Sequence, residues 1–143
     1  MINDINSEAA VLSAMMIDTK STAIATQLVN ESHFAYNSHK LIFNNIKELF
    51  DDNIEIDTLT LADRLKRNSD LETVGGISFI NELSDVVLSS SNLTYHTDII
   101  IRLKELRDII EVGKWMVRVA ESGKYPREIK NEVFNKLTIV EVT

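Results

Sequence analysis

The sequence predicts an all-α fold: a compact bundle of about five to six helices followed by a C-terminal helical hairpin. Apolar residues recur at three- and four-residue steps along most of the chain, which is the spacing of helix faces buried against a core. The 143 residues include only four glycines and one proline, fewer than a turn-rich β-sandwich needs. A composition of 44% hydrophobic and 26% charged residues is that of one folded domain.

Two helices are predicted at the start of the chain. Asp4 precedes the first and is a suitable N-cap, because its carboxylate can accept from the free N–H groups of the first turn. A polar break at 18–21 follows, and Thr19 or Ser21 can cap a second helix that ends at Leu28. The residues expected on the buried side of the first helix are Ala9, Leu12 and Met16, with Ala10 and Ile17 beside them.

The next two predicted helices are separated by a linker. The first opens at Asn37 or Ser38 and is clearly amphipathic. Segment 53–58 alternates like a strand, but the alternation stops there, so an extended linker is favoured over a strand. Asp57 is a good cap for the helix over 59–67. The apolar side of the helix that opens at 37–38 consists of His39, Ile42, Phe43, Ile46, Leu49 and Phe50.

Glycine and proline mark the boundaries of the remaining helices. Two glycines at 75–76 precede a helix over 77–87, because they give the backbone freedom to turn. A long helical pattern then covers 93–122. Gly123 just past its end, followed by Pro126 at a first helical position, predicts that this helix stops and a last one begins.

The helix over 93–122 carries two neighbouring apolar lines. The first line follows alternating four- and three-residue steps, the repeat of a coiled-coil seam. It consists of Ile99, Leu103, Leu106, Ile110, Gly113, Val117 and Ala120. The last helix offers Ile129, Val133, Leu137 and Val140 to this line. The two helices are therefore predicted to form a hairpin with these residues in its seam.

The second apolar line needs a different cover. It consists of Ile109, Val112, Met116 and Val119, with Trp115 near its edge. A hairpin has only one interior seam, so either the rest of the domain or a second copy of the chain must pack on this line. A second copy is favoured, because the hairpin is C-terminal and the first five helices can close a core on their own. Residues 1–98 are predicted as a globular helical bundle and 99–143 as the hairpin of the same structural unit.

No catalytic, cofactor-binding or metal-binding residue is predicted in this chain. It contains no cysteine, which excludes disulfides, thiolate metal sites and cysteine nucleophiles. Neither Gly113-Lys114 nor Gly123-Lys124 has the upstream glycine and the following Ser or Thr of a phosphate loop. The three histidines lack paired ligand spacing, and His39 is expected to be a hydrogen-bonded core histidine.

Charge and hydropathy narrow the possible partners. Fifteen basic against 22 acidic residues give a net charge of −7, which opposes binding to phosphate backbones, so little or no direct nucleic-acid binding is expected. No apolar run reaches the ~18 residues of a membrane span. The N-terminus lacks the basic start and apolar core of a signal peptide. A cytoplasmic domain that binds other proteins is the favoured class.

Four stretches spread over nearly the whole chain resemble one known family in their residues and order. They are residues 7–18, residues 34–43 around His39, the pair 56–61 and 71–76 that ends in Gly75-Gly76, and residues 92–100 with Arg107 and Ile109-Ile110 beyond. Together they resemble the N-terminal domain of the bacterial and phage replicative DNA helicase, the DnaB family. The departures from the family pattern are Ser13 where Gly is usual, Ala35 where Tyr is usual and His96 where an aromatic residue is common.

The resemblance implies an assembly and docking function. In that family the domain is all-helical, its hairpins pair, and three pairs form a collar stacked on a ring of motor domains. The resemblance implies that this chain ends before the linker and the ATPase domain, so ATP and Mg²⁺ are expected only in that absent motor domain and no cofactor in this chain. It also implies contacts with primase and, in some systems, with a helicase loader. The expected function is that of a non-catalytic domain that dimerises, builds the collar and docks one of these proteins.

Two alternatives stay open. One is a free-standing phage or plasmid protein that binds and regulates a helicase or a primase, which a stop codon after Thr143 would favour. The other is the helicase-binding domain of a primase. The start of the first helix directly after Met1 disfavours it, because a primase carries its polymerase domain upstream.

Overall fold

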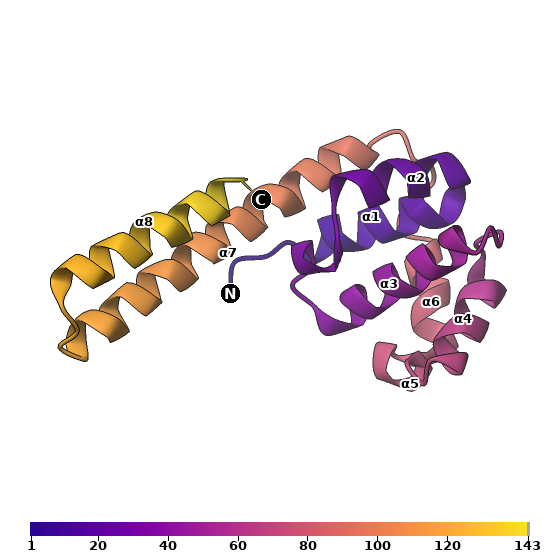
Figure 1. Cartoon of the computed structure of the whole chain (residues 1–143). Coiled ribbons are helices and arrows are strands. Elements are labelled where there is room, and N and C mark those ends of the chain that lie inside the picture. The colour runs from indigo at the N-terminus through magenta and orange to yellow at the C-terminus, as the bar shows by residue number, and fades with distance from the viewer. Residues whose placement is uncertain (143) are drawn as a thin grey trace.

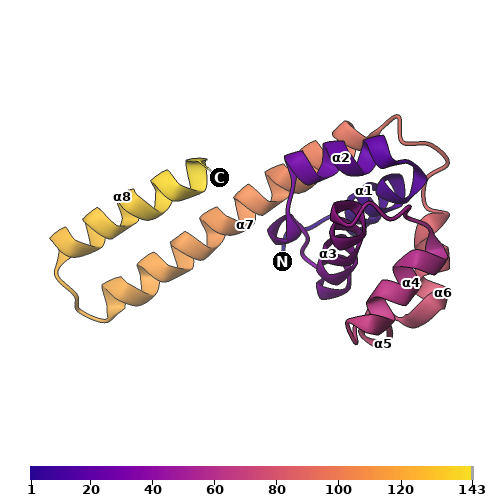
Figure 2. The ribbon, with the colours of Figure 1, turned by 45° about the vertical axis from the view of Figure 1, so that its right-hand side comes forward.

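The computed structural model describes the backbone of residues 1–142 and the side chains of residues 1–138. This part of the chain forms eight α-helices and one 3-10 turn and contains no strand, which confirms the predicted all-α class. Helices α1–α6 form a rounded body, α7 runs out of it, and α8 folds back along α7 as a hairpin (Figures 1 and 2). The elements in chain order are α1 (Ile5–Ile17), α2 (Thr19–Leu28), η1 (Glu31–His33), α3 (Asn37–Asp51), α4 (Thr58–Arg67), α5 (Leu71–Val74), α6 (Gly76–Ser84), α7 (Leu93–Glu121) and α8 (Pro126–Val142).

Aspartates cap three of the body helices. The carboxylate of Asp4 accepts from the backbone N–H of Ser7 at 3.0 Å, as predicted for α1. Helix α2 is capped by Asp18, whereas Thr19 and Ser21, the two predicted caps, lie within the helix. Asp57 caps α4 in a reciprocal arrangement with Thr60, in which each side chain accepts from the other residue's backbone N–H. The predicted extended linker is confirmed, because residues 52–57 form no strand.

Helix α1 is buried on several sides rather than on one. It packs against α2, α3, α6 and α7. Val11, Leu12 and Met15 are fully buried, whereas Ile17 is 43% exposed. The prediction of a single buried side was therefore correct for Leu12 and wrong for Ile17. An amphipathic pattern is a poor guide to a central helix, because its neighbours cover most of its circumference.

Helix α3 confirms its predicted apolar side, and the turn after α4 adds an unexpected element. Of the predicted side only Phe50 is partly exposed. The single-turn helix α5 was not predicted. Gly75 joins it to α6 with φ at +110°, and a Cβ there would lie 3.1 Å from the Cβ of Phe79. Both the left-handed backbone and the close approach explain a glycine at this position.

A buried hydrogen bond between two side chains fastens α1 to α3. The side chains of Glu8 and His39 are 1% and 3% exposed, and the Nδ1 of His39 donates to Oε1 of Glu8 at 2.8 Å. The other carboxylate oxygen, Oε2, accepts from the backbone N–H of Ala35 at 2.9 Å. Oε1 also accepts from the backbone N–H of Tyr36, at 3.5 Å. The prediction of a hydrogen-bonded core histidine at position 39 is confirmed.

Helix α7 belongs to both the body and the hairpin. Its first turns bury Leu93, Thr97 and Ile100 against the body. Further along, the guanidinium of Arg107 donates to the backbone carbonyls of Ile2, at 3.0 Å, and His33, at 3.3 Å. These bonds hold the N-terminal segment and η1 against α7. The helix runs without interruption through the predicted division between 1–98 and 99–143.

Candidate protein interface

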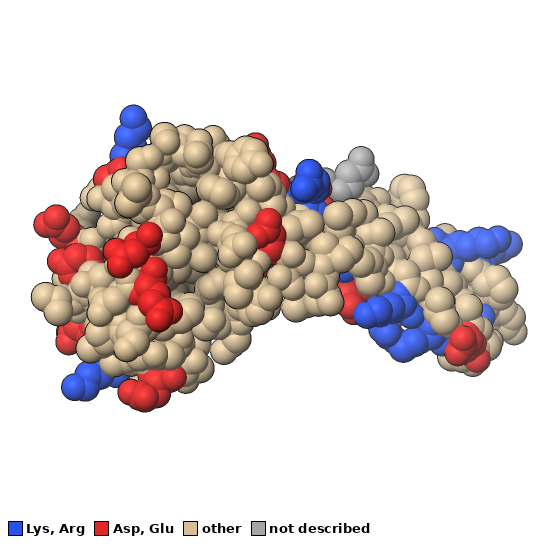
Figure 3. Space-filling view, turned by 180° about the vertical axis from the view of Figure 1, so that it is seen from behind, with Lys and Arg blue, Asp and Glu red and all other residues tan. Residues whose placement is uncertain are grey.

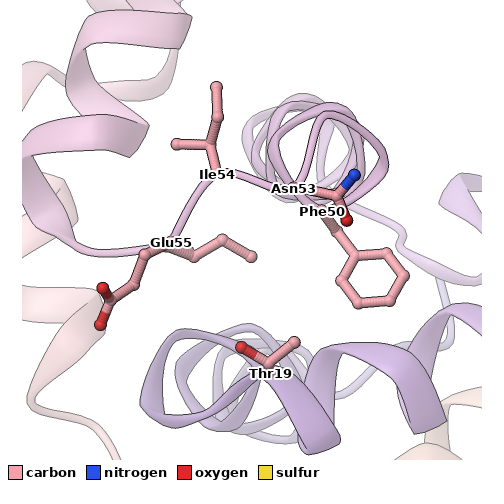
Figure 4. Close-up of a pocket in the computed structure, with 6 residues that line it drawn as sticks. Thr19, Phe50, Asn53, Ile54 and Glu55 are labelled. Atoms are coloured by element: carbon pink, nitrogen blue, oxygen red, sulfur yellow. The ribbon is translucent and has the colours of Figure 1, made fainter.

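Neither a metal site nor a convergence of catalytic groups is found in the described residues around one hollow of the body. No group of three or more His, Cys, Asp or Glu residues is placed to hold a metal ion in that part of the chain. A hollow of about 310 Å³ lies between α2 and the linker after α3. Figure 4 shows the Glu55 carboxylate and the Asn53 side-chain amide on different sides of it, so these polar groups do not converge on one point. A catalytic site needs such convergence.

The seam of the hairpin follows Val112, Trp115 and Val119. Val112 is 9% exposed, and Trp115 and Val119 are half-buried. The ammonium of Lys136 on α8 lies 4.8 Å from the centre of the Trp115 ring, close enough for a cation–π interaction. Ile129 and Val133, predicted in the seam, are also half-buried.

The predicted first line of α7 is mostly turned away from α8. Leu106, Ile110 and Val117 are 41%, 39% and 57% exposed. Ile99 and Leu103 are half-buried near the body end of the helix. On α8, Leu137 is 43% exposed, and the side chain of Val140 lies outside the described residues. The structure corrects the predicted seam because both lines of α7 are apolar, and periodicity alone does not say which of them meets α8.

The predicted interface residues separate into two groups. Ile109 and Met116 are 49% and 39% exposed, so they are available to another molecule. Val112, Trp115 and Val119 face the seam instead, as shown above. The structure contains one copy of the chain, so a contact between copies stays a prediction.

Exposed apolar side chains form a surface on one side of the hairpin. Met116 follows Trp115, Phe134 follows Val133 and Leu137 follows Lys136, each by one residue and therefore by a rotation of about 100° from the seam. In an antiparallel pair of helices, the same sense of rotation leads to the same side. Phe134, which is 70% exposed, was missed because it is out of phase with the other apolar residues of α8. We define the apolar hairpin face as Leu106, Ile109, Ile110, Met116, Val117, Phe134 and Leu137.

Charge is unevenly divided between the body and the hairpin. Residues 1–92 carry 14 acidic and 6 basic side chains, whereas residues 93–143 carry 8 and 9. Figure 3 shows acidic side chains over much of the body and basic ones on the hairpin. The hairpin is therefore close to neutral in a chain of net charge −7. Two copies can bring their hairpins together with little repulsion, whereas two bodies repel each other.

No helix in the described part of the chain is long and apolar enough to cross a membrane.

Sequence comparisons find replicative helicases. The chain is 28% identical over 137 residues to the replicative DNA helicase DnaB of Buchnera aphidicola, a match that covers 94% of this chain and 30% of the helicase. It is 33% identical over 132 residues to DnaB of Rhodothermus marinus, covering 89% of this chain and 14% of that protein. The chain thus spans less than a third of the length of these relatives.

Solved structures share the fold. The N-terminal domain of DnaB helicase from Mycobacterium tuberculosis superposes with a TM-score of 0.92 at 22% identity, covering 97% of this chain and 98% of that one. A structure of a DnaB-like replicative helicase and its interactions with primase gives a TM-score of 0.77 at 18% identity, covering 96% of this chain and 31% of the other. The family model described as the DnaB-like helicase N-terminal domain matches residues 1–102, more than half of the chain. The chain therefore belongs to the DnaB-like helicase N-terminal domain family.

Proposed function

We propose that this chain is the non-catalytic N-terminal domain of a hexameric replicative DNA helicase, and that it pairs with a second copy through the apolar hairpin face. The family and the relatives named as replicative helicases support the first part. The second part rests on one observation: seven large apolar side chains of the hairpin, each between 39% and 70% exposed, lie outside its seam. Exposed apolar surface of this kind is typical of a protein–protein contact.

The exposed area is sufficient for a reversible dimer. Fully burying a large apolar side chain contributes about 1.5–3 kcal/mol, so burying the exposed half of one contributes roughly 1 kcal/mol. Seven such residues on each of two copies contribute roughly 14 kcal/mol. Association costs about 4–15 kcal/mol, which offsets most of this gain. The net gain is at most about 10 kcal/mol, and we therefore expect a reversible dimer with a dissociation constant in the micromolar range or weaker.

Sedimentation equilibrium of a charged variant tests the pairing. Met116→Glu places a carboxylate in the middle of the apolar hairpin face, and we expect the chain to become monomeric. Leu59→Glu is the matched control, because Leu59 is 78% exposed on α4 in the body and its replacement introduces the same carboxylate in place of a large apolar side chain. It is expected to leave the dimer intact. A wild type that is monomeric up to about 1 mM, or a Met116→Glu variant of unchanged mass, contradicts the pairing.

We propose primase or a helicase loader as the further partner of the paired domain. The support is a relative of this fold whose structure includes its interactions with primase. Under this proposal ATP and Mg²⁺ bind to a motor domain outside this chain, and the protein acts in the cytoplasm, where bacterial and phage DNA is replicated. Fluorescence anisotropy of the labelled chain titrated with its cognate primase is expected to rise to saturation. An unchanged anisotropy with both primase and loader at about 100 µM excludes them as partners of the isolated chain.

A further inference from the structure

Gly113 occupies an unusual place in α7. It lies in the interior of a helix of 29 residues, eight residues before its end. Glycine in a helix interior is less favourable than alanine by about 1 kcal/mol, because it gives up more backbone freedom on folding. A glycine in such a place calls for a specific reason.

The described part of the chain provides no reason for this glycine. The backbone at Gly113 is helical and not in the left-handed region, so the conformation does not require it. Apart from its chain neighbours and the backbone of its own helix, a Cβ added there would meet no atom of the described residues within 4 Å. Gly75 is the contrasting case, because its φ of +110° and its approach to Phe79 both demand a glycine. Alanine would therefore suit a single copy of the chain better at position 113.

Gly113 is surrounded by the apolar hairpin face. Residues three and four positions away are its neighbours on the helix surface. These are Ile109 and Ile110 one turn before it and Met116 and Val117 one turn after it, with exposed fractions of 49%, 39%, 39% and 57%. All four are large and apolar, so they form a ring of side chains around Gly113, where no side chain covers the helix backbone.

We infer that Gly113 is the point at which the α7 helices of two copies cross, on the two-fold axis of the dimer. This inference rests on the proposed pairing and adds the place and the closeness of the contact. A two-fold axis brings a residue on it against its own counterpart. Without a side chain at that point, the two backbones approach each other closely. The ring of one copy then interdigitates with that of the other, so that Ile109 and Ile110 pack against the partner's Met116 and Val117, and the reverse.

Disulfide trapping tests the position of the axis directly. The chain has no cysteine, so a single introduced one can cross-link only to its counterpart. Gly113→Cys is expected to form a covalent dimer in most of the chains on mild oxidation, because a disulfide joins Cα atoms about 4.4–6.8 Å apart. Lys114→Cys is the matched control. Its side chain is exposed at the same level of the helix but rotated by about 100° out of the ring, and less than a tenth of the chains are expected to cross-link.

A second experiment uses the opposite effects of one substitution on the monomer and on the dimer. We expect Gly113→Ala to weaken the dimer about tenfold and Gly113→Leu more than a hundredfold, because each holds the backbones apart. In the monomeric Met116→Glu background, we expect Gly113→Ala to raise the Tm by about 3 °C through its helix propensity. Loss of pairing together with gain of stability separates a close contact between copies from damage to the fold.

The outcomes distinguish the two proposals. A wild-type chain that never dimerises overturns the pairing and this inference with it. A wild-type chain that dimerises, with unchanged dissociation constants for Gly113→Ala and Gly113→Leu, overturns only the crossing at Gly113. Stronger cross-linking by Ala120→Cys, about two turns along α7, than by Gly113→Cys likewise moves the axis away from Gly113.

Discussion

Removing the buried carboxylate of Glu8 is expected to destabilise the body severely. Glu8→Ala takes away an acceptor that serves the Nδ1 of His39 and the backbone N–H groups of Ala35 and Tyr36. The side chains of both Glu8 and His39 are almost completely buried, so water cannot replace the lost partner. Leaving a buried donor unpaired costs about 1–3 kcal/mol. Three donors lose this acceptor, so the expected total loss is about 4 kcal/mol.

Urea denaturation of wild type and variant at equal protein concentration measures this loss. A domain of this size has a total unfolding free energy of about 5–15 kcal/mol, so the expected loss of about 4 kcal/mol is a large share of it. With a denaturant dependence of about 2 kcal/mol per molar urea, the midpoint falls by about 2 M. Glu31→Ala, at an exposed position in η1, is the control and is expected to change the free energy by less than about 0.5 kcal/mol.

The double variant Glu8→Ala with His39→Phe separates the contact between the two side chains from the contacts of Glu8 with the backbone. If the two side chains act as a pair, the double variant loses clearly less stability than the sum of the single variants. Additive losses would mean that Glu8 acts through the loop before α3 alone. A midpoint shift below about 0.5 M for Glu8→Ala would refute the reasoning. The buried hydrogen bonds of Glu8 would then contribute little to the free energy of unfolding.

Two further predictions concern other parts of the molecule. Burial lowers the pKa of His33, whose Nδ1 accepts from the backbone N–H of Asn30, so the folded state resists protonation there; stability present at pH 7 is lost as the pH falls below about 6.5. Unfolding free energies measured between pH 7 and pH 5 are expected to fall less steeply for His33→Gln, and equal slopes would contradict this. Trp115→Ala removes the ring beneath Lys136 and is expected to speed hydrogen exchange in 126–138 at least tenfold while the protection of α1 and α3 is unchanged. Equal exchange rates in both proteins would show that the ring does not hold α8.

The sequence predicted helices well where one face alone is buried. The apolar side of α3 and the cap at Asp57 follow from local spacing and local hydrogen bonding, and both are confirmed. Helix α1 is different, because it is covered on several sides. Which of its positions stay exposed depends on which other helices pack against it. The single turn α5 was missed because four residues are too few to show a period. These features depend on the tertiary arrangement.

The candidate interface could be predicted only in part for a related reason. The abundance of apolar side chains on α7 correctly indicated more surface than one hairpin seam can bury. Choosing the seam required the rotation of α7 about its axis, and Leu106 and Ile110 differ from Val112 only by that rotation. The exposed Phe134 lies outside the three- and four-residue pattern, so the pattern does not indicate it. A large apolar residue out of phase on an otherwise polar helix face is the signal that identifies such positions.

The continuity of α7 has a mechanical consequence. Its 29 residues span about 43 Å at about 1.5 Å per residue, and neither proline nor a bend-inducing break divides the part embedded in the body from the part in the hairpin. The helix therefore acts as a stiff lever with its fulcrum where Arg107 fastens the N-terminal segment and η1. The part of α7 beyond Arg107 is about 21 Å long, so a tilt of about 5° displaces the far tip by roughly 2 Å. A protein that binds the body and tips it slightly thus moves the distant end of the hairpin by more than the length of a carbon–carbon bond.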